Sequence, residues 1–348
     1  MLPWTEFGVW LQLGYSENFG DHLVTNHRID VHHHILPPEY ASRVGAERIG
    51  RLIVSGRMPD WSPQHSIDAM DRNGIETAVT SISAPGLWFG DDDAAGDLAR
   101  LCNEYAAEMR RDHPDRFGLF ASLPLPDVDA SLREIEYALD VLKADGIGLL
   151  THYGERYPGE LEFQPVFDEL NRRKAVVYFH PTEAPCACHS LGDIPAATLD
   201  FPFDTTKAVT SLLFAGTFAR CRDIRFIFSH AGGTIPFLAE RISRLEMRPE
   251  FKEKVPNGAI AELKRLYYDT ALSANRYAFS ALFELVESGQ VLFGSDYPFA
   301  PEATMTATVK GLAELGLDAD VLRGIERDNA LGLLPQVAEA IGAADGGF

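Results

Sequence analysis

The sequence predicts a (β/α)8 barrel, in which eight parallel strands alternate with helices around a closed sheet. Eight short segments of mostly apolar, β-branched or aromatic residues recur along the chain, as expected for strands buried on both faces. Longer amphipathic segments lie between them, as crossover helices do. A doubly wound sheet is the competing fold, and it usually carries a Gly-rich phosphate loop. Neither G-x-G-x-x-G nor G-x-x-x-x-G-K-[ST] occurs here, so the barrel is preferred.

The predicted strands and helices alternate in order along the chain. The strands span Arg28–Val31, Thr77–Ser83, Phe117–Ser122, Gly146–Leu150, Ala175–Phe179, Arg225–Ser229, Leu266–Asp269 and Gln290–Gly294. The helices span Ser66–Asn73, Asp97–Asp112, Ala130–Ala144, Gln164–Lys174, Thr205–Ala219, Pro236–Glu246, Asn275–Ser288 and Val321–Leu334. Asp204 is predicted to cap the fifth helix, because a carboxylate there accepts hydrogen bonds from free backbone N–H groups. Two long Pro-rich connections, Pro37–Gln64 and Pro181–Phe203, are expected to cover the top of the barrel as lids.

Length and composition suit one large globular domain. The chain has 348 residues, of which 46% are hydrophobic and 24% charged. Barrels of this size commonly form a single domain. We therefore expect an N-terminal arm over residues 1–27, a barrel over 28–335 and a C-terminal tail over 336–348.

The charge and cysteine content restrict the partners and the compartment. The net charge of −20, without a basic patch, argues against nucleic acid and anionic membranes as partners. It allows an anionic substrate, since a metal ion or Arg near the site outweighs a distant field. No apolar run is long enough to cross a membrane, and the first 27 residues do not resemble a signal peptide. Four cysteines make no disulfide framework, so we expect a cytoplasmic protein.

The first predicted strand leads into three consecutive histidines. Residues two apart on a strand point to the same side, so His32 and His34 can direct their imidazoles at one point while His33 faces away. Two such imidazoles suit a divalent transition metal. By itself the pair is equally compatible with a polar, His-rich loop.

Further metal-binding side chains follow later strands. His180 comes after the fifth strand, His230 after the sixth and Asp296 after the eighth. Catalytic groups of such barrels lie at the carboxyl ends of the strands, so these residues are expected to meet His32 and His34 at one mouth. Each residue taken alone is more commonly a loop or capping residue, and it is the joint pattern that indicates a metal site.

A second group of potential ligands lies close together in the sequence. Cys186, Cys188 and His189 occur within four positions beside Pro185. They supply only three ligands, so we interpret them as part of an ordinary loop rather than a second metal site.

These motifs resemble the amidohydrolase superfamily, in particular the branch of aminocarboxymuconate semialdehyde decarboxylase and the related 2-hydroxybenzoate decarboxylases. The matching segments are 29–34, 179–181, 228–233, 293–298 and 328–334, and the resemblance covers about residues 28–335. It implies a metal-dependent enzyme with a barrel fold, a small carboxylic acid as substrate, no organic cofactor and a homodimeric assembly.

Carried onto this chain, the resemblance implies that His32, His34, His180 and Asp296 bind one divalent ion, while His230 acts as catalytic acid or base. Related decarboxylases often have Glu-x-His at the first pair, whereas this chain has His32, which adds a neutral ligand. Zn²⁺ is therefore the first expectation and Mn²⁺ the second. Binuclear members of the superfamily use a carboxylated Lys after the fourth strand. No Lys stands there, so we expect a mononuclear site.

A flat aromatic acid also requires apolar and cationic contacts. Aromatic residues that follow the predicted strands are the candidates, foremost Trp88, Tyr153, Phe203 and Tyr297, with Phe89, Phe201 and Phe299 beside them. Plain packing explains each of them equally well. Arg51 and Arg57, in the first long connection, are weaker candidates for pairing with a carboxylate. His152 follows the fourth strand, where it can touch substrate but is not expected to be a ligand.

Three functions are compatible with this constellation. The first is non-oxidative decarboxylation of an aromatic or dienoic acid, in which a proton reaches the carboxylate-bearing carbon from Asp296 or His230. The second is hydrolysis or hydration of a lactone, amide or unsaturated diacid. Gly233 stands where deaminase relatives carry Glu, which argues against deamination. The third is metal binding without catalysis, which leaves the five-residue set unexplained.

Overall fold

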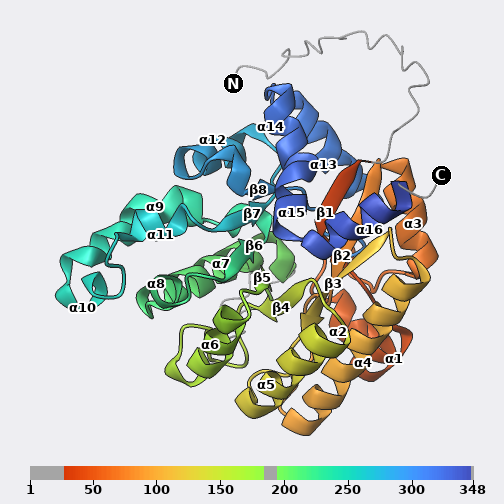
Figure 1. The fold of residues 1–348 in the computed structure, drawn as a ribbon, viewed down its shortest axis with the longest axis horizontal. Helices are drawn as coiled ribbons and strands as arrows, with labels where there is room; N and C mark the ends of the chain where they lie inside the picture. Colours follow the sequence, from red (N-terminus) through yellow and green to blue (C-terminus); the bar gives the residue numbers. More distant parts are fainter. Residues whose placement is uncertain (1–26, 184–193, 346–348) are drawn as a thin grey trace, which may run out of the picture.

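A computed structural model of the protein describes residues 27–183 and 194–345. Eight parallel strands form one sheet in the order β1 to β8, with helices packed around it (Figure 1). The strands are β1 (Arg28–His34), β2 (Ile75–Ser81), β3 (Phe117–Ser122), β4 (Gly146–Leu150), β5 (Val176–His180), β6 (Arg225–Phe228), β7 (Tyr267–Asp269) and β8 (Val291–Leu292). The predicted (β/α)8 architecture is confirmed, with each strand near its predicted position.

Hydrogen bonds between β1 and the segment that follows β8 bring the two ends of the sheet together. Val31 N–H donates to the Phe293 carbonyl at 3.0 Å, and His34 N–H donates to the Tyr297 carbonyl at 2.7 Å. The pairing of β1 with β2 shifts register between Asp30 and His33. Closure of the barrel therefore places the histidines of β1 directly beside the segment that carries Asp296.

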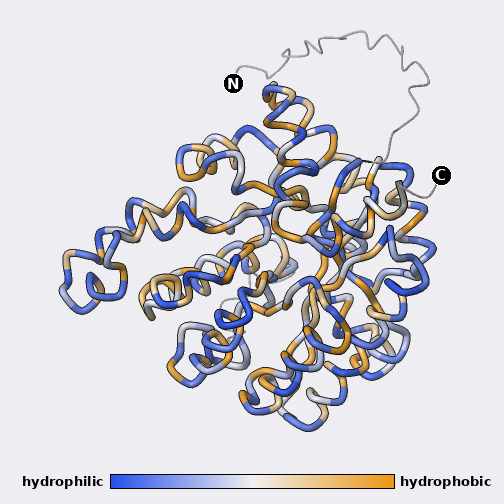
Figure 2. Tube along the Cα trace, in the orientation of Figure 1, coloured by the Kyte–Doolittle hydropathy of each residue, from blue (hydrophilic) through white to orange (hydrophobic). Residues whose placement is uncertain are grey.

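The helices form the outer layer, and residues along them alternate between hydrophilic and hydrophobic (Figure 2). They are α1 (Pro38–Val44), α2 (Ala46–Gly50), α3 (Pro63–Arg72), α4 (Asp92–Asp112), α5 (Val128–Glu136), α6 (Gln164–Arg172), α7 (Ala196–Phe214), α8 (Thr217–Arg220), α9 (Ile235–Ser243), α10 (Pro249–Lys252), α11 (Ala259–Leu263), α12 (Arg276–Leu285), α13 (Glu302–Glu314), α14 (Ala319–Arg323), α15 (Asn329–Leu333) and α16 (Pro335–Asp345). Their apolar faces join the outer faces of the strands in the main core cluster.

A separate apolar cluster closes the end of the barrel away from the functional residues. Val337 and Ile341 of α16 are buried against strand residues that include Ile29 and Val31. Residues 336–345, expected to be a tail, thus continue a helix that covers this end. The N-terminal arm, apart from residue 27, lies outside the described residues, as do Cys186, Cys188 and His189.

Two predictions about helices are corrected by the structure. Helix α7 begins at Ala196, so Asp204 is a buried residue inside the helix and not its N-cap. Pro202 lies within this helix, so residues 196–203 of the predicted connection Pro181–Phe203 are helical. Helix α13 was not predicted, and the first long connection contains the short helices α1 and α2.

Candidate metal centre

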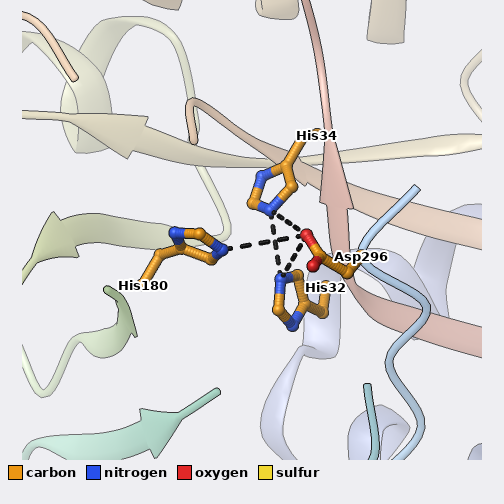
Figure 3. A group of neighbouring side chains, drawn as sticks. All are labelled: His32, His34, His180 and Asp296. Carbon is orange, nitrogen blue, oxygen red and sulfur yellow. Dashed lines mark hydrogen bonds and ion pairs between the residues drawn. The ribbon is translucent and has the colours of Figure 1, made fainter. Parts of the chain in front are cut away.

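Four predicted ligands meet at the carboxyl ends of the strands. The nearest ligand atoms of His32, His34, His180 and Asp296 all lie within 4.8 Å of one another (Figure 3). Asp296 Oδ1 is 3.2 Å from His32 Nε2 and 3.1 Å from His34 Nε2. It is 3.8 Å from His180 Nε2. Three imidazoles and one carboxylate oxygen thus converge on a single point.

The donor set fits a divalent metal. His180 Nε2 and Asp296 Oδ1 are buried and, among the described residues, neither makes a hydrogen bond of good geometry, although histidine nitrogens surround the carboxylate oxygen at 3.1 to 3.8 Å. Buried polar atoms are nearly always paired, so two unpaired atoms aimed at the same point indicate a ligand. Three nitrogens and one oxygen are a donor set typical of Zn²⁺ and related ions.

Burial and neighbouring charges set the protonation of the ligands. Burial lowers the pKa of His34 to about 4 and that of His180 well below its ordinary value. Burial also disfavours charge on His32, but the carboxylates of Asp269 and Asp296 outweigh it and raise its pKa to about 10. Burial alone would raise the pKa of Asp296, yet the charge on His32 and the close approach of the other histidines hold it well below the usual range. His34 and His180 are thus neutral and Asp296 is ionised, which are the protonation states that metal binding requires. A bound cation would displace the proton of His32.

A second layer of contacts fixes the orientation of the ligand rings. His32 Nδ1 is 2.8 Å from Asp269 Oδ2, and both side chains are fully buried. His34 Nδ1 is 3.0 Å from Ser81 Oγ, and His180 Nδ1 is 2.8 Å from the Pro181 carbonyl. Each ring therefore presents Nε2 to the centre. Such outer contacts also raise the basicity of the ligands.

We expect Asp269→Asn to weaken metal binding by about 10- to 100-fold, the usual cost of losing such a partner. The variant removes the carboxylate that orients His32, and it leaves all four ligands in place. Titration with a competing chelator measures the affinity. Asp145→Asn is the matched control, because the Asp145 carboxylate is also buried but accepts a hydrogen bond from Leu119 N–H at the opposite end of the barrel. Equal metal affinity in the Asp269 variant and the wild type would contradict the prediction.

His230 stands beside this cluster but outside it. Its Nε2 is 3.4 Å from Asp296 Oδ2, the oxygen that is not shared with the three histidines. Its backbone N–H donates to Asp269 Oδ1 at 2.9 Å, so one carboxylate holds both His32 and His230. His230 and Asp296 have φ values of +54° and +63°. Non-glycine residues in this left-handed region are uncommon and concentrate at functional sites.

Close packing around the centre depends on a glycine. A Cβ on Gly294 would lie 2.7 Å from His32 Cβ and 3.1 Å from Asp269 Cβ. Only glycine allows the segment after β8 to approach β1 and β7 this closely. His33 points away from the centre, as predicted, and its ring nitrogens contact Asp30 and Ser66.

The residues predicted to contact the substrate lie in different parts of the structure. Trp88 and Tyr153 line one cavity of about 420 Å³, together with Phe89, Arg51 and His152. Arg51 is ion-paired with Glu183 at 2.6 Å.

The remaining aromatic candidates and Arg57 lie elsewhere. The rings of Phe201 and Phe299 lie 6.0 Å and 5.5 Å from those of His180 and His34, respectively. Phe203 is 48% exposed on α7. The Tyr297 ring lies 5.2 Å from the ring of His33, tilted by 40°, and His33 points away from the ligands. Arg57 is exposed in the first connection.

Asp269 is the functional residue that sequence reasoning missed. It ends β7, and the rule that selected His180 and His230 from their positions after strands applies equally to it. Asp is also common at strand ends for capping, so its position alone gave no reason to single it out.

The chain belongs to the amidohydrolase family, whose model matches residues 29–336. The protein named decarboxylase yanB from Aspergillus niger is 36% identical over 324 residues, covering 89% of this chain and 88% of that protein. The 6-methylsalicylic acid decarboxylase of Penicillium expansum is 36% identical over 316 residues, covering 89% and 97%. The resemblance to this superfamily and to its hydroxybenzoate decarboxylases is therefore confirmed.

Solved structures share the same fold. A crystal structure of an amidohydrolase II superposes with a TM-score of 0.82 at 27% identity, covering 88% of this chain and 99% of that one. The 5-carboxyvanillate decarboxylase of Novosphingobium aromaticivorans, crystallised with manganese and a nitrobenzoic acid, gives a TM-score of 0.78 at 19% identity, covering 90% and 97%. Within the described residues, no helix is both long and apolar enough to cross a membrane.

Proposed function

We propose that this protein is a metal-dependent decarboxylase of an aromatic carboxylic acid and that its substrate is a 2-hydroxybenzoate. The main observation behind this proposal is the cluster of four potential metal ligands, with His230 beside it. The four residues are His32, His34, His180 and Asp296. The proposal is also supported by relatives named as decarboxylases, one of them of 6-methylsalicylic acid, over nearly the whole chain.

We propose that the four converging side chains hold one divalent ion, with Zn²⁺ first and Mn²⁺ second. Three imidazoles suit Zn²⁺, while a manganese-containing structure of the same fold supports Mn²⁺ as the alternative. A bound ion would supply a positive charge that polarises the carboxylate and the ortho-hydroxyl of the acid. A single ion is favoured because Lys143 and Lys174 precede β4 and β5, at the wrong end of the barrel for a bridging Lys.

The pair formed by His230 and Asp296 is suited to move a proton. Asp296 must be ionised to serve as a ligand, so the mobile proton resides on His230. From His230 it passes to the ring carbon that bears the carboxylate, directly or by way of Asp296 Oδ2. A C–H bond forms, the bond to the carboxylate carbon breaks, and its electron pair returns to the ring as CO₂ leaves. A histidine suits this step because its ordinary pKa lies near working pH.

The cavity lined by Trp88 and Tyr153 is our proposal for the wall that accepts the aromatic ring. A volume of about 420 Å³ is sufficient for a single-ring acid. Arg51 at its rim is our candidate for steering the carboxylate, although it is paired with Glu183.

Release of CO₂ from a panel of salicylates and resorcylates, incubated with protein of known metal content, tests the decarboxylase proposal. Metal-free protein and His230→Asn serve as controls for background decarboxylation. Turnover of lactones or amides without CO₂ would favour the hydrolase alternative. A metal-loaded, folded protein that converts no member of either panel would contradict catalysis altogether.

We propose further that the protein is a homodimer and that the face formed by α7, α9 and α10 is the interface. Phe237 and Met247 are 82% and 86% exposed. Met247 lines a groove of about 1180 Å³ together with Phe214, Ile242 and Phe251, and Phe237 directly precedes Leu238, another lining residue. Large exposed apolar groups gathered beside an apolar groove are typical of interaction surfaces.

Sedimentation of the double variant Phe237→Glu, Met247→Lys tests this interface. We expect its dimer dissociation constant to rise by at least about 100-fold, because exposed apolar anchors dominate such interfaces. Val141→Glu, at a residue that is 62% exposed on a different face, is the control and should sediment like the wild type. A wild-type monomer at micromolar concentration would contradict the proposal.

We also propose a cytoplasmic location, which is supported by free buried thiols at Cys102 and Cys221. The division into an N-terminal arm of residues 1–27 and a barrel over 28–335 is likewise our proposal, and it agrees with a family match that begins at residue 29.

A further inference from the structure

His152 makes an unusual pair of contacts just after β4. Its Nδ1 is 2.9 Å from the Gly154 carbonyl, and its Nε2 is 2.7 Å from the Glu183 carbonyl. A carbonyl oxygen can only accept a hydrogen bond. A neutral imidazole has one donor and one acceptor, so it can satisfy only one of these contacts, whereas an imidazolium donates from both nitrogens. Both contacts are therefore hydrogen bonds at the same time only if each ring nitrogen carries a proton.

A buried carboxylate supplies the matching charge. Asp204, fully buried in α7, has Oδ2 3.6 Å from His152 Nε2. It accepts hydrogen bonds from the hydroxyls of Thr151 and Tyr157, which are neutral donors. Buried charges are rarely left unpaired. Among the described residues, His152 is the basic side chain that forms an ion pair with Asp204. The other carboxylates nearby are Glu183, which is paired with Arg51, and Glu155, which lines the same cavity.

These contacts hold the segment that directly follows the metal ligand His180. Thr151 N–H donates to the His180 carbonyl at 3.1 Å, and Thr182 N–H donates to Thr151 Oγ1 at 3.2 Å. The bond from His152 to the Glu183 carbonyl extends this pairing beyond the ends of β4 and β5. The Glu183 carboxylate in turn accepts a hydrogen bond from Arg51, which lines the cavity that we assign to the substrate. His152 is thus connected to this cavity through Glu183 and Arg51.

We propose that His152 is held as an imidazolium by Asp204 and that it is a positioning residue. It fixes the residues after His180, and through Glu183 it places Arg51 at the cavity. Both of its ring nitrogens are engaged by carbonyls, so it does not bind substrate through them. The assignment of the cavity to substrate rests on the proposed function, whereas the charge on His152 does not.

Nitrogen NMR of the full-length, zinc-loaded protein with ¹⁵N-labelled histidine tests the charge directly. At pH 7 we expect both ring nitrogens of His152 to be protonated. Loss of the signal in His152→Gln assigns it, and contacts to the ring protons of Tyr157, 5.8 Å away, assign it if that variant does not fold. In Asp204→Asn we expect one of the two protons to be lost. A wild-type His152 with one bare nitrogen overturns the proposal.

The positioning role is tested by kinetics and by amide exchange in His152→Gln. We expect KM to rise by about tenfold or more, the effect of losing a hydrogen bond to a charged group. The value of kcat and the metal content should stay close to wild type, because no ligand is touched. Exchange at the Thr182 amide should accelerate. His113→Gln, at the end of α4 on the far side of the barrel, is the matched control.

Unchanged KM and unchanged Thr182 exchange in His152→Gln overturn the positioning role, even if the ring is doubly protonated. If no aromatic acid is turned over by any form of the protein, the proposed function fails. The nitrogen spectra and the Thr182 exchange still decide the inference about His152 in that case.

Discussion

Substitution of His230 by Asn is expected to lower turnover by at least about 10³-fold, within the range that one acid–base group contributes. The reason is geometric. His230 Nε2 faces Asp296 Oδ2 at 3.4 Å, next to the ligand cluster, and no other described histidine adjoins the cluster without joining it. Asn is the suitable replacement because His230 has a φ of +54°, a region that Asn tolerates better than most residues.

The same variant should retain its metal. None of the four ligand atoms belongs to His230, so elemental analysis should find the wild-type amount of metal. His113→Asn provides a control for the loss of an imidazole far from the site. Full activity in His230→Asn would remove this residue from the chemistry, while loss of the metal would show that it acts by supporting the ligands.

Removal of the metal is expected to abolish turnover and to destabilise the fold. Without a cation, His180 Nε2 and Asp296 Oδ1 make no hydrogen bond of good geometry among the described residues, and the carboxylate lies among three buried imidazoles. A metal present at about 1,000 times its dissociation constant adds about 4 kcal/mol to the free energy of unfolding. We therefore expect the chelated protein to unfold at a clearly lower temperature than the metal-loaded protein.

Readdition of metal completes this experiment. One equivalent of Zn²⁺ or Mn²⁺ per chain should restore turnover and thermal stability together. His180→Gln is the matched control, since it removes one ligand and should recover neither property at the same metal concentration. Activity that persists in thoroughly chelated protein would contradict a metal-dependent reaction, and binding of two equivalents would contradict a mononuclear site.

Much of the site was predictable because it is encoded in short segments. Alternation along β1 separates His32 and His34 from His33, and apolar runs mark the strands after which His180 and His230 stand. These patterns depend on neighbouring residues only. The rule that parallel barrels present strand ends at one mouth then connects segments that are far apart.

Features that depend on how distant segments meet were not predictable in the same way. Asp269 contacts His32 across 237 positions of sequence, and nothing near Asp269 indicates that partner. Asp204 resembles a helix cap in the sequence, but α7 continues past Pro202 and directs this carboxylate towards Thr151 and Tyr157. The aromatic candidates likewise differ in position: some line the cavity, some lie beside the proposed ligands and some are exposed. These positions depend on how the segments between the strands and helices pack.

The family resemblance supplied the proposed division of the five site residues into four ligands and His230. The sequence by itself determined the order of strands and helices and the convergence of five metal-competent side chains at the strand ends. These follow from local periodicity and from residue types that only metal or acid–base chemistry explains together. The tertiary structure decided which carboxylate orients His32, what His152 holds and which aromatic residues share a cavity. Such contacts arise when the barrel closes and its loops pack, and they depend on side-chain directions that no short stretch of sequence specifies.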